Sequence, residues 1–184
     1  MRRAGVDIPP WDFAVDGVSS ISADQHKFGY SFPGCSTLFF RDKEDMENAV
    51  FNLGPPIMAP TPYHNLTGTR SSTGPAAAWA VMHSLGDEGF AAVAKRIADS
   101  VREICDGVTS IDGIEVYNDP KLSLVTYLLD DPEKAQHVQT QMFMEGWVLM
   151  PLLKPVGAFT MFVGSGHYGR IDSFLESLRK AVQE

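Results

Sequence analysis

An apolar repeat near the middle of the chain constrains the fold more than any other feature. Its members recur at spacings of four, three, four and three residues: Phe90, Ala94, Ile97, Val101 and Ile104. Because an α-helix turns once in about 3.6 residues, this spacing places them on one face of a helix that must be buried. Pro75 predicts that helical structure begins earlier in the chain, near that residue. Glycines at positions 86 and 89 predict an interruption of the helix, and Gly107 predicts its end.

The residues after this helix alternate between β-prone and helical patterns. We expect two kinds of element here, namely strands at 113–117, 121–129, 147–153 and 159–163 and helices at 132–146 and 171–182. Residues 164–169 match the Gly-x-Gly-x-x-Gly pattern of dinucleotide-binding turns. Too few residues follow to build that fold, which favours a tight strand-to-helix turn. Residues 107–184 are therefore predicted to form a small α/β domain.

Composition excludes several classes of protein. The 184 residues carry 23 acidic and 15 Lys or Arg side chains, a formal net charge of −8, which argues against a nucleic-acid partner. No apolar run is long enough to span a membrane or to serve as an export signal, so we expect a cytoplasmic protein. Two cysteines and five scattered histidines make no metal site.

The front of the chain differs from the rest. Short strands are predicted at residues 18–23 and 35–40, with a turn-rich segment between them and a short helix after them. Two strands cannot bury a sheet of their own. We therefore expect residues 1–73 to be the C-terminal part of a larger domain, followed by helices over residues 74–106.

A His-Lys pair follows the first predicted strand and is surrounded by small residues and glycine. A lysine that attacks an aldehyde must lose its proton, which requires partial burial and few carboxylates nearby. The end of a strand is a place where such an amine can be held rigidly. On the residues alone, His26 and Lys27 are also typical of an exposed surface pair, so both interpretations stay open at this point.

Three segments resemble one family, in the family's order. Residues 20–30, which read Ser-Ile-Ser-Ala-Asp-Gln-His-Lys-Phe-Gly-Tyr, resemble the cofactor-lysine segment of the pyridoxal-phosphate group II decarboxylases. That family includes amino-acid decarboxylases and sphingosine-phosphate lyases. Residues 66–71 resemble its Gly-Thr-Arg-Ser block, and residues 79–90 resemble its interdomain helix. The resemblance implies an α/β fold of the fold-type I class of pyridoxal-phosphate enzymes: the end of the large domain and a C-terminal small domain.

The resemblance also assigns roles to residues. Lys27 is implied to form the internal aldimine with pyridoxal phosphate, and His26 and Asp24 to line the phosphate side of the cofactor. Gly68 and Thr69 are implied to contact the phosphate of the partner subunit's cofactor.

Two further residues are candidates for contact with the substrate. Arg70 carries the fixed positive charge of the Gly-Thr-Arg-Ser block, and a structural ion pair is an equal alternative for it. Tyr63 lies just before that block, where a cleft residue and a surface residue are equally plausible.

The resemblance implies a carbon–carbon lyase, and one position bears on its substrate. Sphingosine-phosphate lyases carry a lysine six positions after the aldimine lysine, and Pro33 stands there in this chain. A phosphate group needs fixed cations, which favours decarboxylation of an amino acid over an aldehyde-lyase reaction. The family's aspartate on the pyridine nitrogen has no counterpart in residues 1–17. We therefore also keep a non-catalytic dimerising remnant as an alternative, and expect a homodimer or association with a missing N-terminal part.

Overall fold

The computed structural model describes residues 1–53, 61–63, 70–117 and 119–184. Its internal contacts divide the chain into two compact units. Met1–Ile8 and Glu88–Glu184 form one, here called the C-terminal unit, and Pro9–Asp87 form the other, here called the Lys27 unit. Each is described by itself.

The predicted long helix is present and contains the predicted break. Helix α2 covers Thr73–Val108, and Gly86 inside it has a non-helical backbone with φ 57° and ψ −174°. A positive φ of this size suits glycine, because other residues would bring their Cβ against the backbone. The boundary between the two units falls directly after this break.

The C-terminal unit contains an antiparallel sheet with the strand order β5-β6-β8-β7. Its elements are β5 (Ile114–Val116), β6 (Leu124–Leu129), a 3-10 turn (Pro132–Lys134), α3 (Ala135–Met144), β7 (Met150–Pro151), β8 (Ala158–Phe162), a second 3-10 turn (Ser165–His167) and α4 (Ile171–Gln183). The segment 164–169 is therefore a strand-to-helix turn, as predicted.

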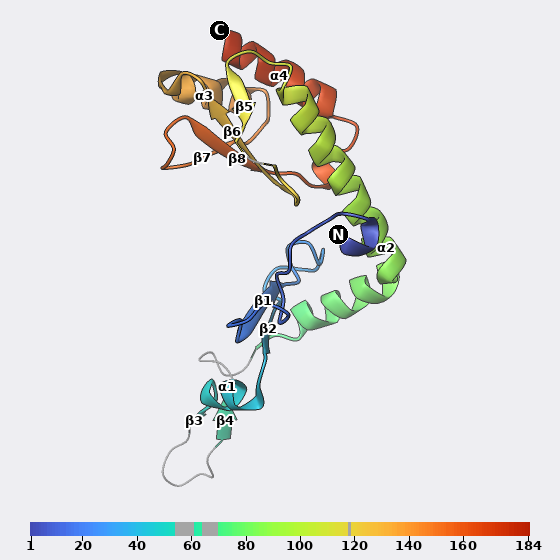
Figure 1. Ribbon diagram of the computed structural model, residues 1–184. Coiled ribbons are helices and arrows are strands. Elements are labelled where there is room, and N and C mark those ends of the chain that lie inside the picture. Colours follow the sequence, from blue (N-terminus) through green and yellow to red (C-terminus); the bar gives the residue numbers. More distant parts are fainter. Residues whose placement is uncertain (54–60, 64–69, 118) are drawn as a thin grey trace. The chain divides into compact units, whose positions relative to one another are not determined.

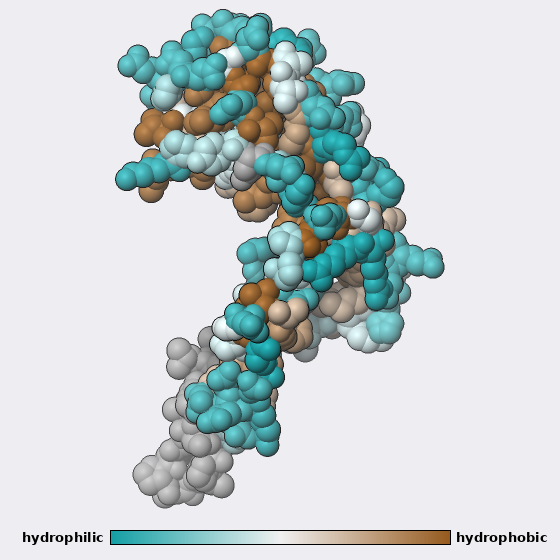
Figure 2. Space-filling view, viewed as in Figure 1, coloured by the Kyte–Doolittle hydropathy of each residue, from teal (hydrophilic) through white to brown (hydrophobic). Residues whose placement is uncertain are grey.

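Helices α3 and α4 and the second half of α2 lie on one side of this sheet (Figure 1). Alternate residues of β6 point toward them, because successive side chains of a strand face opposite ways. Val125, Tyr127 and Leu129 are buried in this core, and Tyr127 pairs in register with Phe159 of β8. Apolar side chains also remain on the surface of this unit (Figure 2), including Phe162, which is 57% exposed.

One predicted strand is much shorter in the structure. Residues 147–153 were predicted as a strand, and only Met150–Pro151 pair with β8. The Trp147 N–H donates instead to the carbonyl of Met142, which ends helix α3. Pro151 has no N–H to offer a ladder and lies in the strand at the edge of the sheet, where proline is tolerated.

The Lys27 unit consists of short elements. Strands β1 (Ser20–Asp24) and β2 (Ser36–Phe40) form an antiparallel pair, helix α1 covers Lys43–Asn48, and β3 (Phe51–Leu53) pairs with β4 (Thr61–Tyr63). The β3–β4 pair was not predicted, because the prolines at residues 54–62 indicated only a loop. Residues 54–60 lie outside the described part of the chain.

Little of the Lys27 unit is buried. Among its described side chains and glycines, only Cys35, Gly74 and Ala78 are buried. Leu38 and Phe39 are neighbours in β2 and therefore face opposite sides of the two-stranded sheet, yet they are 56% and 47% exposed. Both faces of this sheet thus present apolar side chains to solvent.

None of the helices in the part of the chain that the structure describes combines the length and the apolar character that a membrane span requires.

Candidate functional site

Lys27 lies in a tight turn between β1 and β2. Its backbone N–H donates to the carbonyl of Asp24 at 3.1 Å, and its own carbonyl accepts from the Tyr30 N–H at 3.0 Å. The Ser31 N–H donates back to the Gln25 carbonyl at 2.9 Å. Successive bonds of this kind fix the backbone on both sides of Lys27.

Glycine is required at position 29 of this turn. A Cβ there would lie 2.5 Å from the Gln25 carbonyl oxygen and 2.8 Å from the Gln25 Cα. Such contacts with backbone atoms cannot be relieved by moving a flexible side chain. Tyr30 follows with φ 55°, a left-handed conformation that is uncommon for a residue with a side chain.

The amine of Lys27 is paired with a carboxylate. Its Nζ lies 2.7 Å from Oδ2 of Asp24, and the two side chains are 66% and 30% exposed. Hydrogen bonds from Lys27 and then from Ser36 lower the pKa of Asp24 below its usual value. The burial and the distance from carboxylates that we expected of a nucleophilic lysine are thus not present in the Lys27 unit by itself.

His26 is fixed by a backbone carbonyl. Its Nδ1 lies 2.9 Å from the carbonyl oxygen of Cys35, which also accepts from the His26 backbone N–H at 3.4 Å. Cys35 is 8% exposed and directly precedes β2. The ring of His26 is therefore held by the start of the next strand.

The first turn of α2 packs against this same place. The Ser31 hydroxyl donates to the Gly74 carbonyl at 3.3 Å. A Cβ on Gly74 would come within 3.1 Å of the Cys35 Cβ and 3.3 Å of the Gly34 carbonyl oxygen. A side chain at position 74 would therefore require these neighbours to shift by a few tenths of an ångström.

The structure brings together three of the predicted site residues, namely Asp24, His26 and Lys27. Gly68 and Thr69 lie outside the described residues, and Tyr63 ends strand β4. Arg70 is exposed.

The parts played by Ser31, Cys35 and Gly74 in holding this turn were not predicted from the sequence. The Cys35 carbonyl could not be found because a backbone acceptor carries no residue signature. A glycine directly before a helix-starting proline was the one available signal of a close approach at position 74.

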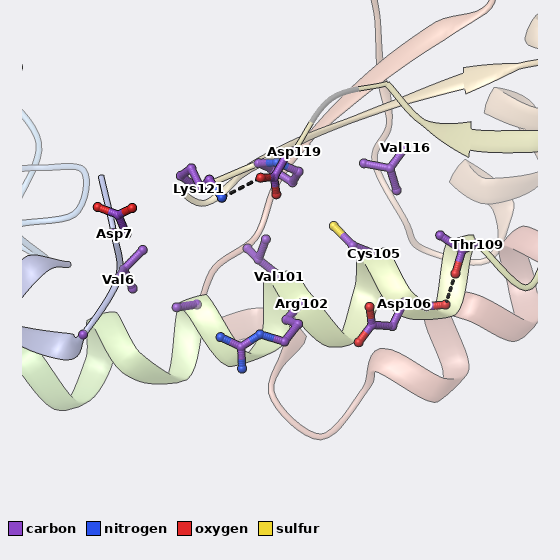
Figure 3. A pocket seen from close by; sticks show the side chains of 13 residues that line it. Val6, Asp7, Val101, Arg102, Cys105, Asp106, Thr109, Val116, Asp119 and Lys121 are labelled. Carbon is purple, nitrogen blue, oxygen red and sulfur yellow. Dashed lines mark hydrogen bonds and ion pairs between the residues drawn. The ribbon is translucent and has the colours of Figure 1, made fainter. Parts of the chain in front are cut away.

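The C-terminal unit has a pocket of about 390 Å³ (Figure 3). It lies between the N-terminal segment, one face of α2 and the connection from β5 to β6, and its charged lining residues are Asp7, Arg102, Asp106, Asp119 and Lys121. The Lys121 Nζ and an Asp119 carboxylate oxygen pair at 2.5 Å.

The Cys105 thiol points into this pocket (Figure 3). Burial, followed by the carboxylates of Asp106 and Asp119, raises the pKa of this thiol to about 11. It is therefore protonated at neutral pH and is a poor nucleophile.

The fold and the Lys27 turn define an α/β protein of the fold-type I class of pyridoxal-phosphate enzymes, as the sequence predicted. The family described as "Pyridoxal-dependent decarboxylase conserved domain" matches residues 5–130. The chain belongs to this family.

Curated relatives include both lyases and decarboxylases. The chain is 34% identical to the sphingosine-1-phosphate lyase of Drosophila melanogaster over 100% of its own length and 34% of the relative's. It is 33% identical to that of Arabidopsis thaliana, over 99% and 33% of the two chains. A probable L-aspartate decarboxylase of Archaeoglobus fulgidus is 28% identical, over 95% and 46%. The chain thus spans about a third of the length of these lyases.

Solved structures of both kinds of enzyme, lyase and decarboxylase, are also similar to this chain. The sphingosine-1-phosphate lyase of Burkholderia pseudomallei superposes with a TM-score of 0.86 at 34% identity, covering 96% of this chain and 40% of the other. A glutamate decarboxylase of Lactobacillus brevis has a TM-score of 0.77 at 22% identity, covering 94% and 42%, and supports the fold alone.

Proposed function

We propose that this chain is the lysine-bearing part of a pyridoxal-phosphate-dependent carbon–carbon lyase, and that it acts as an amino-acid decarboxylase. The observation that carries the proposal is Lys27 itself, held at the end of β1 in a turn that requires glycine at position 29. Membership of the pyridoxal-dependent decarboxylase family supports the same assignment. Within it, residues 1–73 belong to the large domain, 74–106 to interdomain helices and 107–184 to the small domain.

The described residues fit the aldehyde and phosphate ends of the cofactor. The Lys27 amine is exposed, and its ion pair with Asp24 is of the exposed kind that contributes little stability, so the amine is free to leave the carboxylate. His26 has one ring nitrogen engaged by Cys35, which leaves Nε2 for the phosphate group. When bound, pyridoxal phosphate supplies an electron-withdrawing ring that accepts the electron pair of the broken bond.

Each residue then has a defined task. Lys27 would hold the cofactor through its amine nitrogen, once that amine has left its ion pair with Asp24. Gly68 and Thr69 contact the phosphate of a partner's cofactor, and Arg70 and Tyr63 contact the substrate. We further propose that the protein is a cytoplasmic homodimer.

The choice of decarboxylase rests on the charge of the Lys27 turn. Lys27 is the single Lys or Arg in residues 25–34, and Pro33 takes the place of the lysine that sphingosine-phosphate lyases use. No cation of this turn is therefore left for a substrate phosphate once Lys27 holds the cofactor.

A sphingosine-phosphate-lyase-like aldehyde-lyase is the second candidate. The specific observation in its favour is that curated relatives matched over 99–100% of this chain are sphingosine-1-phosphate lyases. A non-catalytic dimerising remnant is the alternative from another class.

Covalent capture of the cofactor tests the proposal. The chain is incubated with pyridoxal phosphate, reduced with borohydride and digested, and mass spectrometry locates the modified lysine. We expect the label on Lys27, its loss in Lys27→Ala, and its retention in Lys43→Ala, which removes a lysine that is 81% exposed. Folded chain with no label at Lys27 would favour the remnant. Two assays separate the two enzymes. A decarboxylase would release carbon dioxide from amino acids, and an aldehyde-lyase would release an aldehyde from a phosphorylated long-chain amine.

A further inference from the structure

The strand that leads to Lys27 lacks the usual cause of a fixed register. Every side chain of β1 and β2 is exposed or half-buried in the Lys27 unit by itself. Register is strongly specified where one face of a sheet is buried, because a slip by one residue then moves the apolar side chains into solvent. The connection, residues 25–35, is also longer than the loops of about two to five residues that impose a register on a hairpin. Within this unit, other contacts therefore have to set the register.

Arg41, which directly follows β2, makes such contacts with the segment that leads into β1. Its Nε donates to the Val18 carbonyl at 2.7 Å. Its Nη2 donates to the carbonyls of Phe13 and Val15 at 2.8 and 2.9 Å, and its backbone N–H donates to the Ser19 carbonyl at 2.8 Å. The guanidinium also lies over the Phe13 ring, 5.5 Å from its centroid. One residue thus joins the chain that enters β1 to the chain that leaves β2.

The guanidinium of Arg41 fits these carbonyls in one register. Its N–H donors point in fixed directions within one plane, unlike the rotatable donors of an ammonium group. A slip of β1 by one residue would move the Val18 carbonyl by about 3.3 Å along β2, which is further than a hydrogen bond can stretch. The three bonds of the side chain therefore disfavour slipped registers, although burial does not.

Resting on the function proposed above, we propose that Arg41 is a positioning residue for Lys27: it fixes the register of β1 against β2, and with it the place at which the amine meets the cofactor aldehyde. Strand β1 ends at Asp24, whose carboxylate pairs with the Lys27 amine at 2.7 Å. A slip of one residue would carry this end of β1 about 3.3 Å along its neighbour. Displacement of a reacting group by about 1 Å can already slow a reaction about a hundredfold.

Pairs of engineered cysteines report the register directly. Ser22 and Leu38 lie opposite each other and are both exposed, so Ser22→Cys with Leu38→Cys should form a disulfide in the native register. Ser22→Cys can meet Phe39→Cys only after a slip by one residue, and Phe40→Cys only after a slip by two. While Arg41 is present, we expect the first pair alone to close on mild oxidation. In Arg41→Gln we expect a slipped pair to close as well, identified by mass spectrometry of the linked peptides.

Three controls separate the register from stability. Lys43→Gln removes a nearby cation that is 81% exposed, and only the native pair should close in it. Arg41→Lys keeps the charge but not the planar fork, so it should behave like Arg41→Gln. Ser20 is paired with Phe40 in the native register. Closure of Ser20→Cys with Ser36→Cys in Arg41→Gln would therefore show that the strands have separated, and would overturn the positioning role.

The effect on Lys27 is measured by labelling with pyridoxal phosphate and borohydride. Lys95 is a matched reference within the same chain, because both side chains are similarly exposed, 64% for Lys95 and 66% for Lys27. Each amine also pairs with a neighbouring aspartate, at 2.6 and 2.7 Å. We expect the ratio of label on Lys27 to label on Lys95 to fall at least about tenfold in Arg41→Gln, and to stay unchanged in Lys43→Gln.

The two proposals fail in different ways. If Arg41→Gln closes the native cysteine pair alone, the positioning role of Arg41 is overturned, and preferential labelling of Lys27 over Lys95 leaves the proposed function standing. If the unmodified chain shows no such preference, the proposed function is overturned, and the disulfide pattern still decides whether Arg41 sets the register of β1.

Discussion

Replacing Tyr127 by phenylalanine should stabilise the C-terminal unit. The Tyr127 side chain is fully buried, and its ring centroid lies 6.3 Å from that of Phe174. Its hydroxyl has no hydrogen-bond partner among the residues that the structure describes. Burial is also the first cause of the raised pKa of this phenol, followed by the Cys105 thiol. The folded state therefore bears the cost of taking a hydroxyl out of water without a new bond.

The magnitude follows from that cost. A buried polar group without a partner is destabilising by about 1–3 kcal/mol. The small void left by one oxygen offsets a few tenths of that, at about 24 cal/mol per Å³. We expect Tyr127→Phe to raise the free energy of unfolding by about 0.5–2.5 kcal/mol. If the hydroxyl were hydrogen-bonded, the same replacement would lower the free energy of unfolding by about 1 kcal/mol. The sign of the change is thus diagnostic.

Urea unfolding followed by tryptophan fluorescence measures this change. Trp147 is 6% exposed in the same core, whereas Trp11 and Trp79 are 59% and 65% exposed and respond little. Tyr117→Phe is the matched control, because Tyr117 is 51% exposed and its replacement should alter stability by less than about 0.5 kcal/mol. A Tyr127→Phe chain that unfolds at lower urea, with an unchanged m-value, would show that the hydroxyl has a partner and refute the reasoning.

Two further changes test other parts of the chain. Gly29→Ala places a Cβ 2.5 Å from the Gln25 carbonyl oxygen and should abolish or strongly reduce labelling of Lys27 by the cofactor. Gly166→Ala is the control, because the space around its added Cβ is open, and this variant should be labelled normally. Equal labelling of the two variants would contradict this account of the turn. Burial is the main cause of a lowered pKa at His167, whose Nδ1 accepts the Gly164 N–H at 3.2 Å. The neutral His167 ring therefore contributes its full stabilisation above the ordinary pKa of 6.5, and this stabilisation is lost as the pH falls below that value. Thermal melts of His167→Gln should accordingly show a smaller fall in melting temperature below pH 6.5 than those of the unmodified chain.

Periodic patterns predicted the C-terminal unit well. The repeat from Phe90 to Ile104 gave helix α2, and Ile97, Val101 and Ile104 of it are buried in the core. The strand predicted over residues 121–129 likewise contains β6 (Leu124–Leu129), although Val125, Tyr127 and Leu129 are buried while the apolar Leu122 and Leu124 are 50% and 43% exposed. Such predictions succeed because a helix or strand that covers a core must repeat its apolar residues with its own geometric period.

The Lys27 unit was harder to predict, for two physical reasons. Its strands bury almost nothing within the described residues, so burial leaves no periodic pattern in them. Its key contacts are also made by backbone atoms, such as the Cys35 carbonyl on His26, or by the absence of a side chain at Gly74. The resemblance to a family found Lys27, but not what holds the turn around it.

The location of the hydrophobic core affects how variants of this chain are assayed. The whole buried cluster belongs to the C-terminal unit, beyond the non-helical residue Gly86. A melting curve therefore reports on that cluster. A variant whose Lys27 turn is disrupted can therefore have the same melting temperature as the original chain. Screening by thermal stability would not detect such a variant, so each variant near Lys27 needs a local probe of its own.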